Sequence, residues 1–144
     1  MTKSANTTTL DDPIFGKMAY KHSWYRRQSI YWWNTTGVDV QITAHAYNGE
    51  GISDQQRTAF SEYKERIEDI IKTSIPSISV YLKNTYDKFF SEEEVFNALT
   101  PRNILFMENG DWGILFDADI DIEHGIALYK EKGTFKVGPQ DDFL

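Results

Sequence analysis

The chain has 144 residues, of which 40% are hydrophobic and 15% aromatic, a composition typical of one globular domain rather than of a disordered segment. It contains no cysteine, which excludes disulfide bonds, thiol nucleophiles and thiolate metal sites. The net charge of −7 opposes binding to nucleic acid, and no apolar run reaches the roughly 20 residues needed to span a bilayer.

The first third of the chain predicts a leader and three strands. Residues 1–10 are polar and rich in threonine, so we predict a flexible leader before a single domain over residues 11–144. The leader lacks the apolar segment of a secretory signal. Aromatic and β-forming residues predict strands at 14–22 and 24–33. Apolar and polar residues then alternate over 38–47, which predicts a strand with one buried face.

Two capping-box patterns predict two helices. Ser53 is followed by Gln56 three residues later, which predicts the start of a long helix. Its apolar residues repeat at helical spacing and continue beyond Pro76. Because proline inside a helix costs about 3 kcal/mol or more, we expect a kink or break near residues 73–76. The second box opens a short helix within residues 91–100.

The last third predicts strands again. Asn109-Gly110 is the dipeptide typical of a tight hairpin turn. The predicted strands cover residues 104–107, 112–122, 126–130 and 134–137, and the second of these is either a strand throughout or a strand that runs into an extended loop. With the elements before them, they give the order β-β-β-α-α-β-β-β-β. This order predicts a single α+β domain, in which a mainly antiparallel sheet carries a long, kinked or broken helix and a short helix on one face.

Acidic residues occupy every second position of the sequence DADIDIEHG, residues 117–125: Asp117, Asp119, Asp121 and Glu123. An EF-hand calcium loop counted from Asp117 would need glycine at its sixth position and glutamate at its twelfth, where this chain has Ile122 and Leu128. A catalytic carboxyl usually owes its raised pKa to burial, whereas these four side chains share a face that we expect to be solvated. The pattern therefore matches neither an EF-hand nor an acid–base pair.

Three interpretations of this acidic row stay open. Side chains at alternate strand positions project in one row, about 7 Å apart. The row is an ordinary solvated face, a surface for the lysine and arginine side chains of a partner, or a weak divalent-ion site. We expect no ordered metal site without a partner. If the row binds anything, we expect it to bind a basic protein surface.

Residues 24–33 concentrate tryptophan and tyrosine beside arginine, the residue types of protein interfaces and equally of cores. Trp24 and Trp33 are therefore either core residues or additional partner-binding residues. Elsewhere the sequence has no nucleophile elbow, phosphate-binding loop or dinucleotide-binding motif, and its three histidines lie far apart. We predict no catalytic residue, no enzymatic activity, no metal and no cofactor.

Four short stretches form a distinctive set: DPIFG at 12–16 with Trp24, GILFDAD at 113–119, EHGIA at 123–127 and VGPQDDFL at 137–144. The set resembles an uncharacterised bacterial domain family whose members often carry EHG before a strand and close on VGPQD-x-FL. The resemblance spans residues 12–144. Pro76 departs from the uninterrupted helix usual in that family.

The resemblance implies an immunity protein, because such domains are often encoded beside polymorphic toxins. It predicts a cytoplasmic protein that neutralises a cognate, basic toxin by covering its active or substrate-binding surface, with no nucleic-acid or membrane partner. The partner-binding candidates are Asp117, Asp119, Asp121, Glu123, Trp24 and Trp33. The alternative is a small-molecule-binding module or small enzyme with a pocket near His45 or Trp32.

Overall fold

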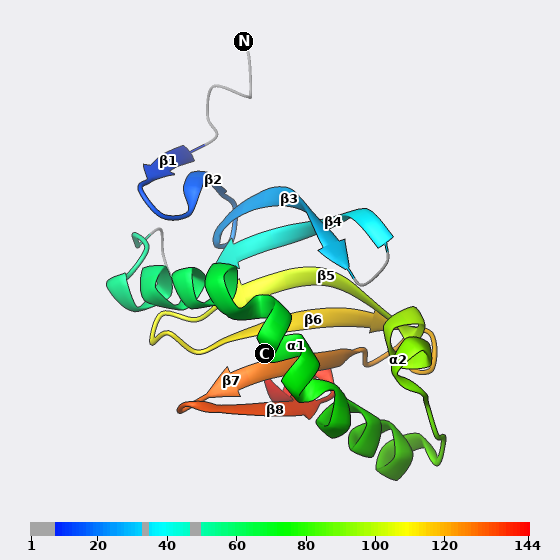
Figure 1. Cartoon of the computed structure of the whole chain (residues 1–144). Helices are drawn as coiled ribbons and strands as arrows, with labels where there is room; N and C mark the ends of the chain where they lie inside the picture. The colour runs from blue at the N-terminus through cyan, green and yellow to red at the C-terminus, as the bar shows by residue number, and fades with distance from the viewer. Residues whose placement is uncertain (1–7, 33–34, 47–49) are drawn as a thin grey trace.

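The structure is a computed structural model that describes residues 8–32, 35–46 and 50–144 (Figure 1). The described residues form one eight-stranded sheet, two α-helices and a C-terminal 3-10 helix. The strands are β1 (Thr8–Asp12), β2 (Gly16–Tyr20), β3 (Trp24–Trp32), β4 (Thr35–Ala44), β5 (Leu99–Phe106), β6 (Trp112–Ala118), β7 (Ile126–Glu131) and β8 (Thr134–Gly138). The helices are α1 (Asp54–Tyr86), α2 (Glu92–Ala98) and η2 (Gln140–Asp142).

The strands lie side by side in chain order, and every neighbouring pair is antiparallel except β4 and β5. The parallel pair arises because α1 and α2 lie between these two strands and return the chain to the end at which β4 began. The predicted α+β class is confirmed. Thr8–Asp12 forms an additional strand, so residues 8–10, which the sequence assigned to the leader, pair with β2 instead.

Helix α1 begins as the sequence predicted. The Ser53 hydroxyl accepts from the Gln56 backbone N–H at 3.1 Å, and the Gln56 side chain accepts from the Ser53 N–H at 2.9 Å. The helix then runs without interruption through Pro76, so of the two predicted outcomes, a kink or a break, the break is wrong. Buried residues on both sides of the proline, among them Ile70 and Ile78, each contribute about 1.5–3 kcal/mol, enough together to offset its cost.

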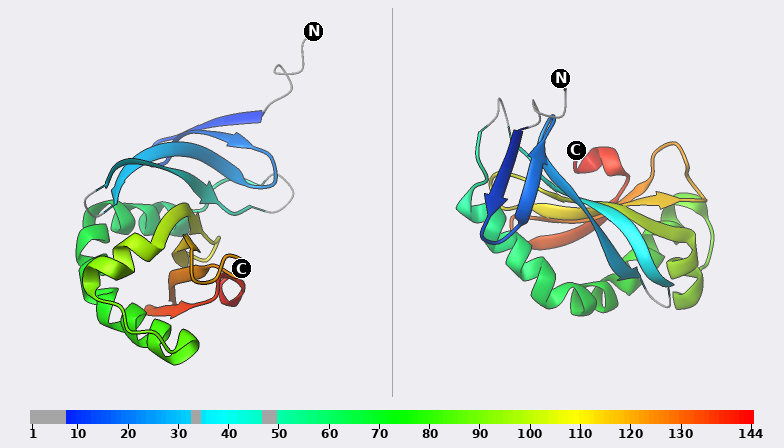
Figure 2. Two further views of the ribbon diagram at one scale, coloured as in Figure 1. Left: turned by 90° about the vertical axis from the view of Figure 1, so that its right-hand side faces the viewer. Right: turned by 90° about the horizontal axis from the view of Figure 1, so that it is seen from above.

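The main core lies between α1 and one face of the sheet, and the C-terminal residues cover part of the other face (Figures 1 and 2). In both figures α1 curves as it crosses the sheet. A smaller apolar cluster on the opposite face comprises Leu105, Leu115, Ala127, Tyr129 and Phe143. None of the described helices is long and apolar enough to cross a membrane.

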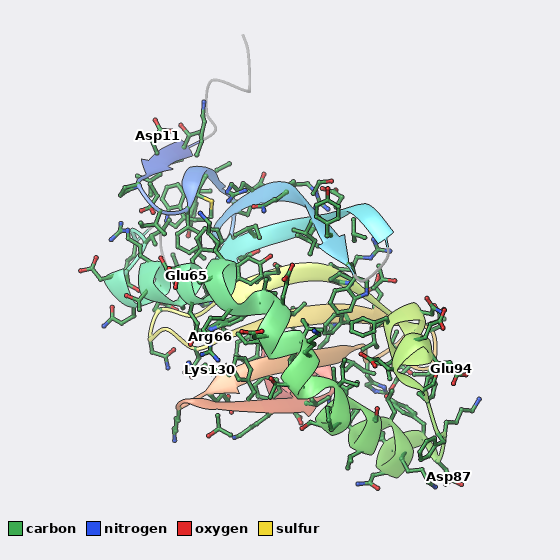
Figure 3. All side chains as sticks on the ribbon, in the orientation of Figure 1. Asp11, Glu65, Arg66, Asp87, Glu94 and Lys130 are labelled. Carbon is green, nitrogen blue, oxygen red and sulfur yellow. The ribbon has the colours of Figure 1, made fainter. Side chains whose placement is uncertain are left out.

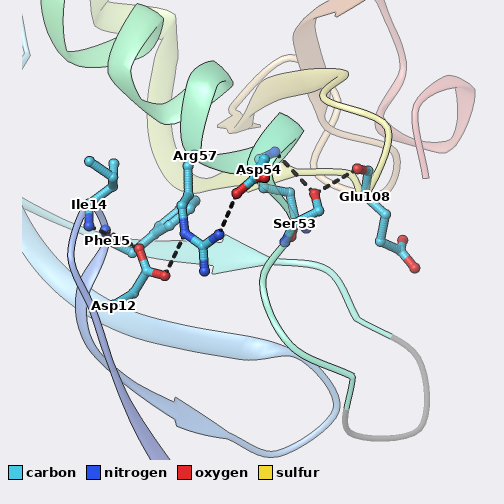
Figure 4. Close-up of polar contacts among 8 residues, drawn as sticks. Asp12, Ile14, Phe15, Ser53, Asp54, Arg57 and Glu108 are labelled. Carbon is cyan, nitrogen blue, oxygen red and sulfur yellow. Dashed lines mark hydrogen bonds and ion pairs between the residues drawn. The ribbon is translucent and has the colours of Figure 1, made fainter.

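Asp12 attaches the β1–β2 hairpin to the beginning of α1 (Figure 4). Its carboxylate is 1% exposed and accepts hydrogen bonds from the backbone N–H groups of Ile14 (3.0 Å) and Phe15 (2.9 Å). The Arg57 Nε donates to its other oxygen at 2.8 Å, and Arg57 also contacts the exposed Asp54. Burial by itself would raise the pKa of Asp12, but these donors outweigh it and lower the pKa below its usual value.

Two predicted strand features differ in the structure. Strand β6 ends at Ala118, four residues before the predicted end, because the chain turns there: the Asp121 N–H donates to the Ala118 carbonyl at 3.1 Å. Ile122, expected on the buried face, is 88% exposed. Asn109-Gly110 lies in a five-residue loop, 107–111, in which Gly110 has a φ of +96°, rather than in a two-residue turn.

Candidate functional site: an acidic end of the molecule

The four alternating acids do not form one strand row. Asp117 lies on β6, is exposed, and accepts from the Arg102 guanidinium at 2.7 Å. Asp119 follows in the turn, is exposed, and donates its N–H to the carbonyl at the end of α2. Asp121 is half-buried, and Glu123 is exposed. The predicted row is therefore wrong beyond Ala118, although three of the four carboxylates do face solvent.

Asp121 has a structural role. Its carboxylate accepts from the Tyr86 hydroxyl at 2.8 Å and from the His124 backbone N–H at 3.1 Å, and it contacts the His124 Nδ1 at 3.0 Å. The bond from Tyr86 is the main cause that lowers the pKa of Asp121. The bond to Asp121 in turn raises the pKa of His124. These contacts join the end of α1 to the β6–β7 connection.

The raised pKa of His124 predicts a pH-dependent contribution to stability. A group whose pKa is higher in the folded state stabilises the fold below its unfolded value and loses this effect as pH rises through its folded value. We therefore expect His124→Gln to destabilise the protein more at about pH 5.5 than at about pH 8.5, on either side of the usual histidine range. Urea denaturation at both pH values measures this difference. In an Asp121→Asn background the pH dependence should disappear; an equal effect at both pH values would contradict the assignment.

Two segments, 87–94 and 117–124, form what we term the acidic end. Together they contain eight carboxylates and one lysine, a sum of −7 that equals the net charge of the whole chain. The bond between Tyr86 and Asp121 and the contact between Asp119 and Ala98 bring the two segments together. Figure 3 shows Asp87 and Glu94 at this end, away from Lys130. The acids of α2 follow no such alternation, which is specific to strands, so the sequence pattern at 117–123 did not indicate them.

Two large apolar side chains are exposed within the acidic end. Phe89 is 86% exposed and Ile122 is 88% exposed. Isolated exposed apolar residues are common on protein surfaces. Here, however, each lies within a few residues of the Tyr86–Asp121 bond, so both are at the same end of the molecule. Apolar side chains surrounded by charged groups are typical of the anchors in protein interfaces.

Of the two aromatic candidates, the structure describes Trp24. Trp24 is 5% exposed, belongs to the core, and donates its indole N–H to the Glu50 carbonyl at 2.7 Å. It is therefore a core residue and not an exposed anchor. Trp33 lies outside the described residues. Trp32 is also in the core and donates to the Leu99 carbonyl at 2.9 Å.

The described residues contain no group of three histidine, aspartate or glutamate side chains arranged to hold a metal ion. His45 is half-buried, as expected for an ordinary histidine, and its Nδ1 lies 2.7 Å from the Glu108 carboxylate. Gln56 next to it is fully buried and donates to the backbone carbonyls of His45 and Phe106. This arrangement ties α1 to the ends of β4 and β5.

A family model described as a domain of unknown function (DUF6985) matches residues 14–144. The chain belongs to this family. The match covers the sheet from β2 onward, both α-helices and the C-terminal residues. The expected membership in an uncharacterised domain family is thereby confirmed, while the link to toxins stays a prediction. No curated protein and no solved structure matches the chain.

Two of the stretches that carry the resemblance contact each other in this DUF6985 domain. Gln140, in the C-terminal stretch, donates its side-chain N–H to the Phe116 carbonyl at 2.8 Å and its backbone N–H to the His124 carbonyl at 3.4 Å. Gly125, in the EHG turn, has a φ of +64°, and a Cβ there would overlap the Gln140 amide. Both motifs therefore stabilise the fold, because the Gln140 side chain fits only where residue 125 has no Cβ.

The last aromatic residue of the DUF6985 domain closes the smaller apolar cluster. The Phe143 ring stacks on Tyr129 with ring centroids 5.1 Å apart. Gly113 lies beneath this pair, where a Cβ would be 2.6 Å from the Tyr129 side chain and 3.1 Å from the Phe143 ring. The C-terminal stretch thus covers part of the sheet face opposite α1.

Proposed function

We propose that this protein is a non-enzymatic binding protein whose acidic end docks on a basic protein, and that this partner is a toxin which it neutralises, as an immunity protein does. The observation that carries the proposal is the concentration of charge: residues 87–94 and 117–124 hold a net charge equal to that of the chain, around exposed Phe89 and Ile122. The family membership is compatible with this function.

The division of roles within the acidic end follows from the contacts of each residue. Asp119 and Glu123 are exposed and available for a partner, whereas Asp121 is held by Tyr86 and His124. Exposed carboxylates raise the association rate with a basic surface, because their long-range field steers the encounter. Phe89 and Ile122 would resist dissociation, since an apolar side chain buried at an interface contributes about 1.5–3 kcal/mol.

The test begins with the product of the adjacent reading frame. Co-expression should restore growth that this product inhibits, and the two proteins should co-purify. Asp119→Asn combined with Glu123→Gln should then slow association about fivefold at low salt and change dissociation little, because steering acts on the on-rate. Stopped-flow measurements at low and high salt separate the two rates, and high salt should remove the difference.

The matched control changes the charge equally at a distance. Asp11→Asn combined with Glu65→Gln removes two exposed carboxylates that lie far from Asp87 and Glu94 (Figure 3). This control should leave the association rate within about twofold of the wild type. If both double variants slow association alike, the acidic end is not the docking surface. If the adjacent product neither binds nor inhibits growth, the immunity function itself fails.

A further inference from the structure

A groove of about 590 Å³ lies between β3 and the middle of α1. Ile67 and Ile71 of α1 form one wall, and the buried residues Ile104 and Ile114 of β5 and β6 lie at its base. All five consecutive residues 28–32 of β3 line the other wall. Because alternate side chains of a strand point to opposite faces, a run of consecutive lining residues means that the edge of β3 faces the groove.

This edge of β3 has no neighbouring strand along most of its length. Strand β2 pairs only with Trp24 and Tyr25, so in the part of the chain that the structure describes the side of β3 away from β4 is unpaired from residue 26 onward. An unpaired strand edge presents main-chain N–H and C=O groups that can accept another strand. Natural edges are commonly blocked by lysine or proline, but residues 28–32, Gln-Ser-Ile-Tyr-Trp, contain neither.

The charged residues that line the groove are Lys64, Glu68, Asp69 and Lys72, and Arg26 lies next to Lys64 at one end. The Arg26 guanidinium and the Lys64 ammonium lie 5.8 and 5.7 Å from the centroid of the same Phe60 ring. Arg26 donates to two neutral acceptors, the Phe15 carbonyl and the Gln28 side chain. Among the described residues no carboxylate lies within ion-pair distance of either cation.

We propose that this groove binds an extended segment of a partner polypeptide, which adds a strand to the open edge of β3. Alternate apolar side chains of the segment enter the groove between Ile30 and Ile67, and an acidic side chain at one end meets Arg26 and Lys64. Main-chain hydrogen bonds to β3 supply affinity, while the apolar wall and the two cations supply selectivity. The proposal goes beyond the acidic end, since it uses other residues and holds whether or not the partner is a toxin.

The test uses the full chain and a random heptapeptide display library as the probe. Selected peptides should alternate apolar residues and carry an acidic residue near one end. The synthetic form of the best peptide should slow hydrogen exchange about tenfold or more at the amides of residues 26–32, as added strand pairing requires. The outer edge strand β8 (Thr134–Gly138) is the internal control and should keep its exchange rates.

Variants of α1 test the groove itself. Ile67→Glu places a charge on the apolar wall and should weaken the peptide about tenfold or more, whereas Val80→Glu, an exposed apolar residue of the same helix outside the groove, should change affinity less than about twofold. Circular dichroism checks that both variants fold. Lys64→Glu changes an exposed residue and should reverse the preference for an acidic peptide even if Ile67→Glu unfolds.

Four results would overturn the proposal. The library yields no binder, or its binders protect β8 instead of β3. An apolar small molecule displaces the peptide and leaves the hydrogen-exchange rates of the β3 amides as they are in the free protein. The groove would then be a small-molecule pocket. The free protein self-associates with its β3 amides protected, which would make a second copy of the chain the occupant.

Discussion

Asp12→Ala should lower the free energy of unfolding by about 3 kcal/mol at neutral pH, since removing one partner of a buried ion pair typically costs about 3–5 kcal/mol. The substitution removes the acceptor of two backbone N–H groups and leaves Arg57 without its buried partner. The hairpin of β1 and β2 would then lose its attachment to α1. Urea denaturation followed by tryptophan fluorescence measures the change, because Trp24 lies beside this hairpin.

The control is Asp54→Ala, which removes the other carboxylate of the same arginine. Asp54 is 95% exposed at its side chain, and exposed pairs contribute about 0–1 kcal/mol. The lowered pKa of Asp12 adds a pH test: its stabilisation is present above its unfolded pKa and is lost as pH falls through the lower, folded value. The effect of Asp12→Ala should therefore shrink at about pH 3. Equal effects of Asp12→Ala and Asp54→Ala would contradict the role of burial.

Gly125→Ala should also cost about 3 kcal/mol, through two separate causes. A non-glycine residue in the left-handed region costs about 1–2 kcal/mol, and Gly125 has a φ of +64°. The new methyl group would also displace Gln140 and lie 3.0 Å from the Phe116 carbonyl, whose hydrogen bond from Gln140 contributes about 1 kcal/mol. Chemical denaturation measures the total, and hydrogen exchange at residues 140–143 reports the release of the C-terminal residues.

Gly133→Ala separates the two causes. Gly133 has a φ of +84° in the β7–β8 turn, and no atom lies within 4 Å of a Cβ placed there. Gly133→Ala should therefore lower the free energy of unfolding only by the cost of the left-handed backbone, about 1–2 kcal/mol. The hydrogen-exchange rates at residues 140–143 should stay unchanged. If Gly125→Ala is no more destabilising than Gly133→Ala, the contact between the EHG turn and the C-terminal residues contributes nothing to stability.

Features that depend on a few neighbouring residues could be predicted from the sequence. Both capping boxes occur where Ser53 and Ser91 predicted them, because each box is closed by residues only three positions apart. The alternation that predicted the strand at 38–47 corresponds to β4, whose residues Val40, Ile42 and Ala44 are buried. The number and order of elements then sufficed for the α+β class.

The candidate site was predictable only in part, because its charges come from two distant segments. The alternation at 117–123 identified four of the acids, but the acids of residues 87–94 and the exposed Phe89 join them only through the fold. Ile122 lies among the four acids in the sequence, but its alternation predicted burial and it is exposed. Tryptophan is a residue type that is frequent at protein interfaces, but Trp24 lies in the core. Exposure is decided by what packs on a side chain, and a local pattern does not contain that information.

The sequence by itself determined the class, the caps and the acidic balance of this protein, since each depends on composition or on contacts within one turn of chain. The tertiary structure alone decided the parallel pairing of β4 with β5, the continuity of α1 through Pro76 and the end of β6 at Ala118. In each case a contact between distant residues outweighed the local preference. Packing on both sides of Pro76 exceeds the cost of one lost hydrogen bond, and the bond from Tyr86 to Asp121 holds the chain in a turn where its alternation favoured a strand.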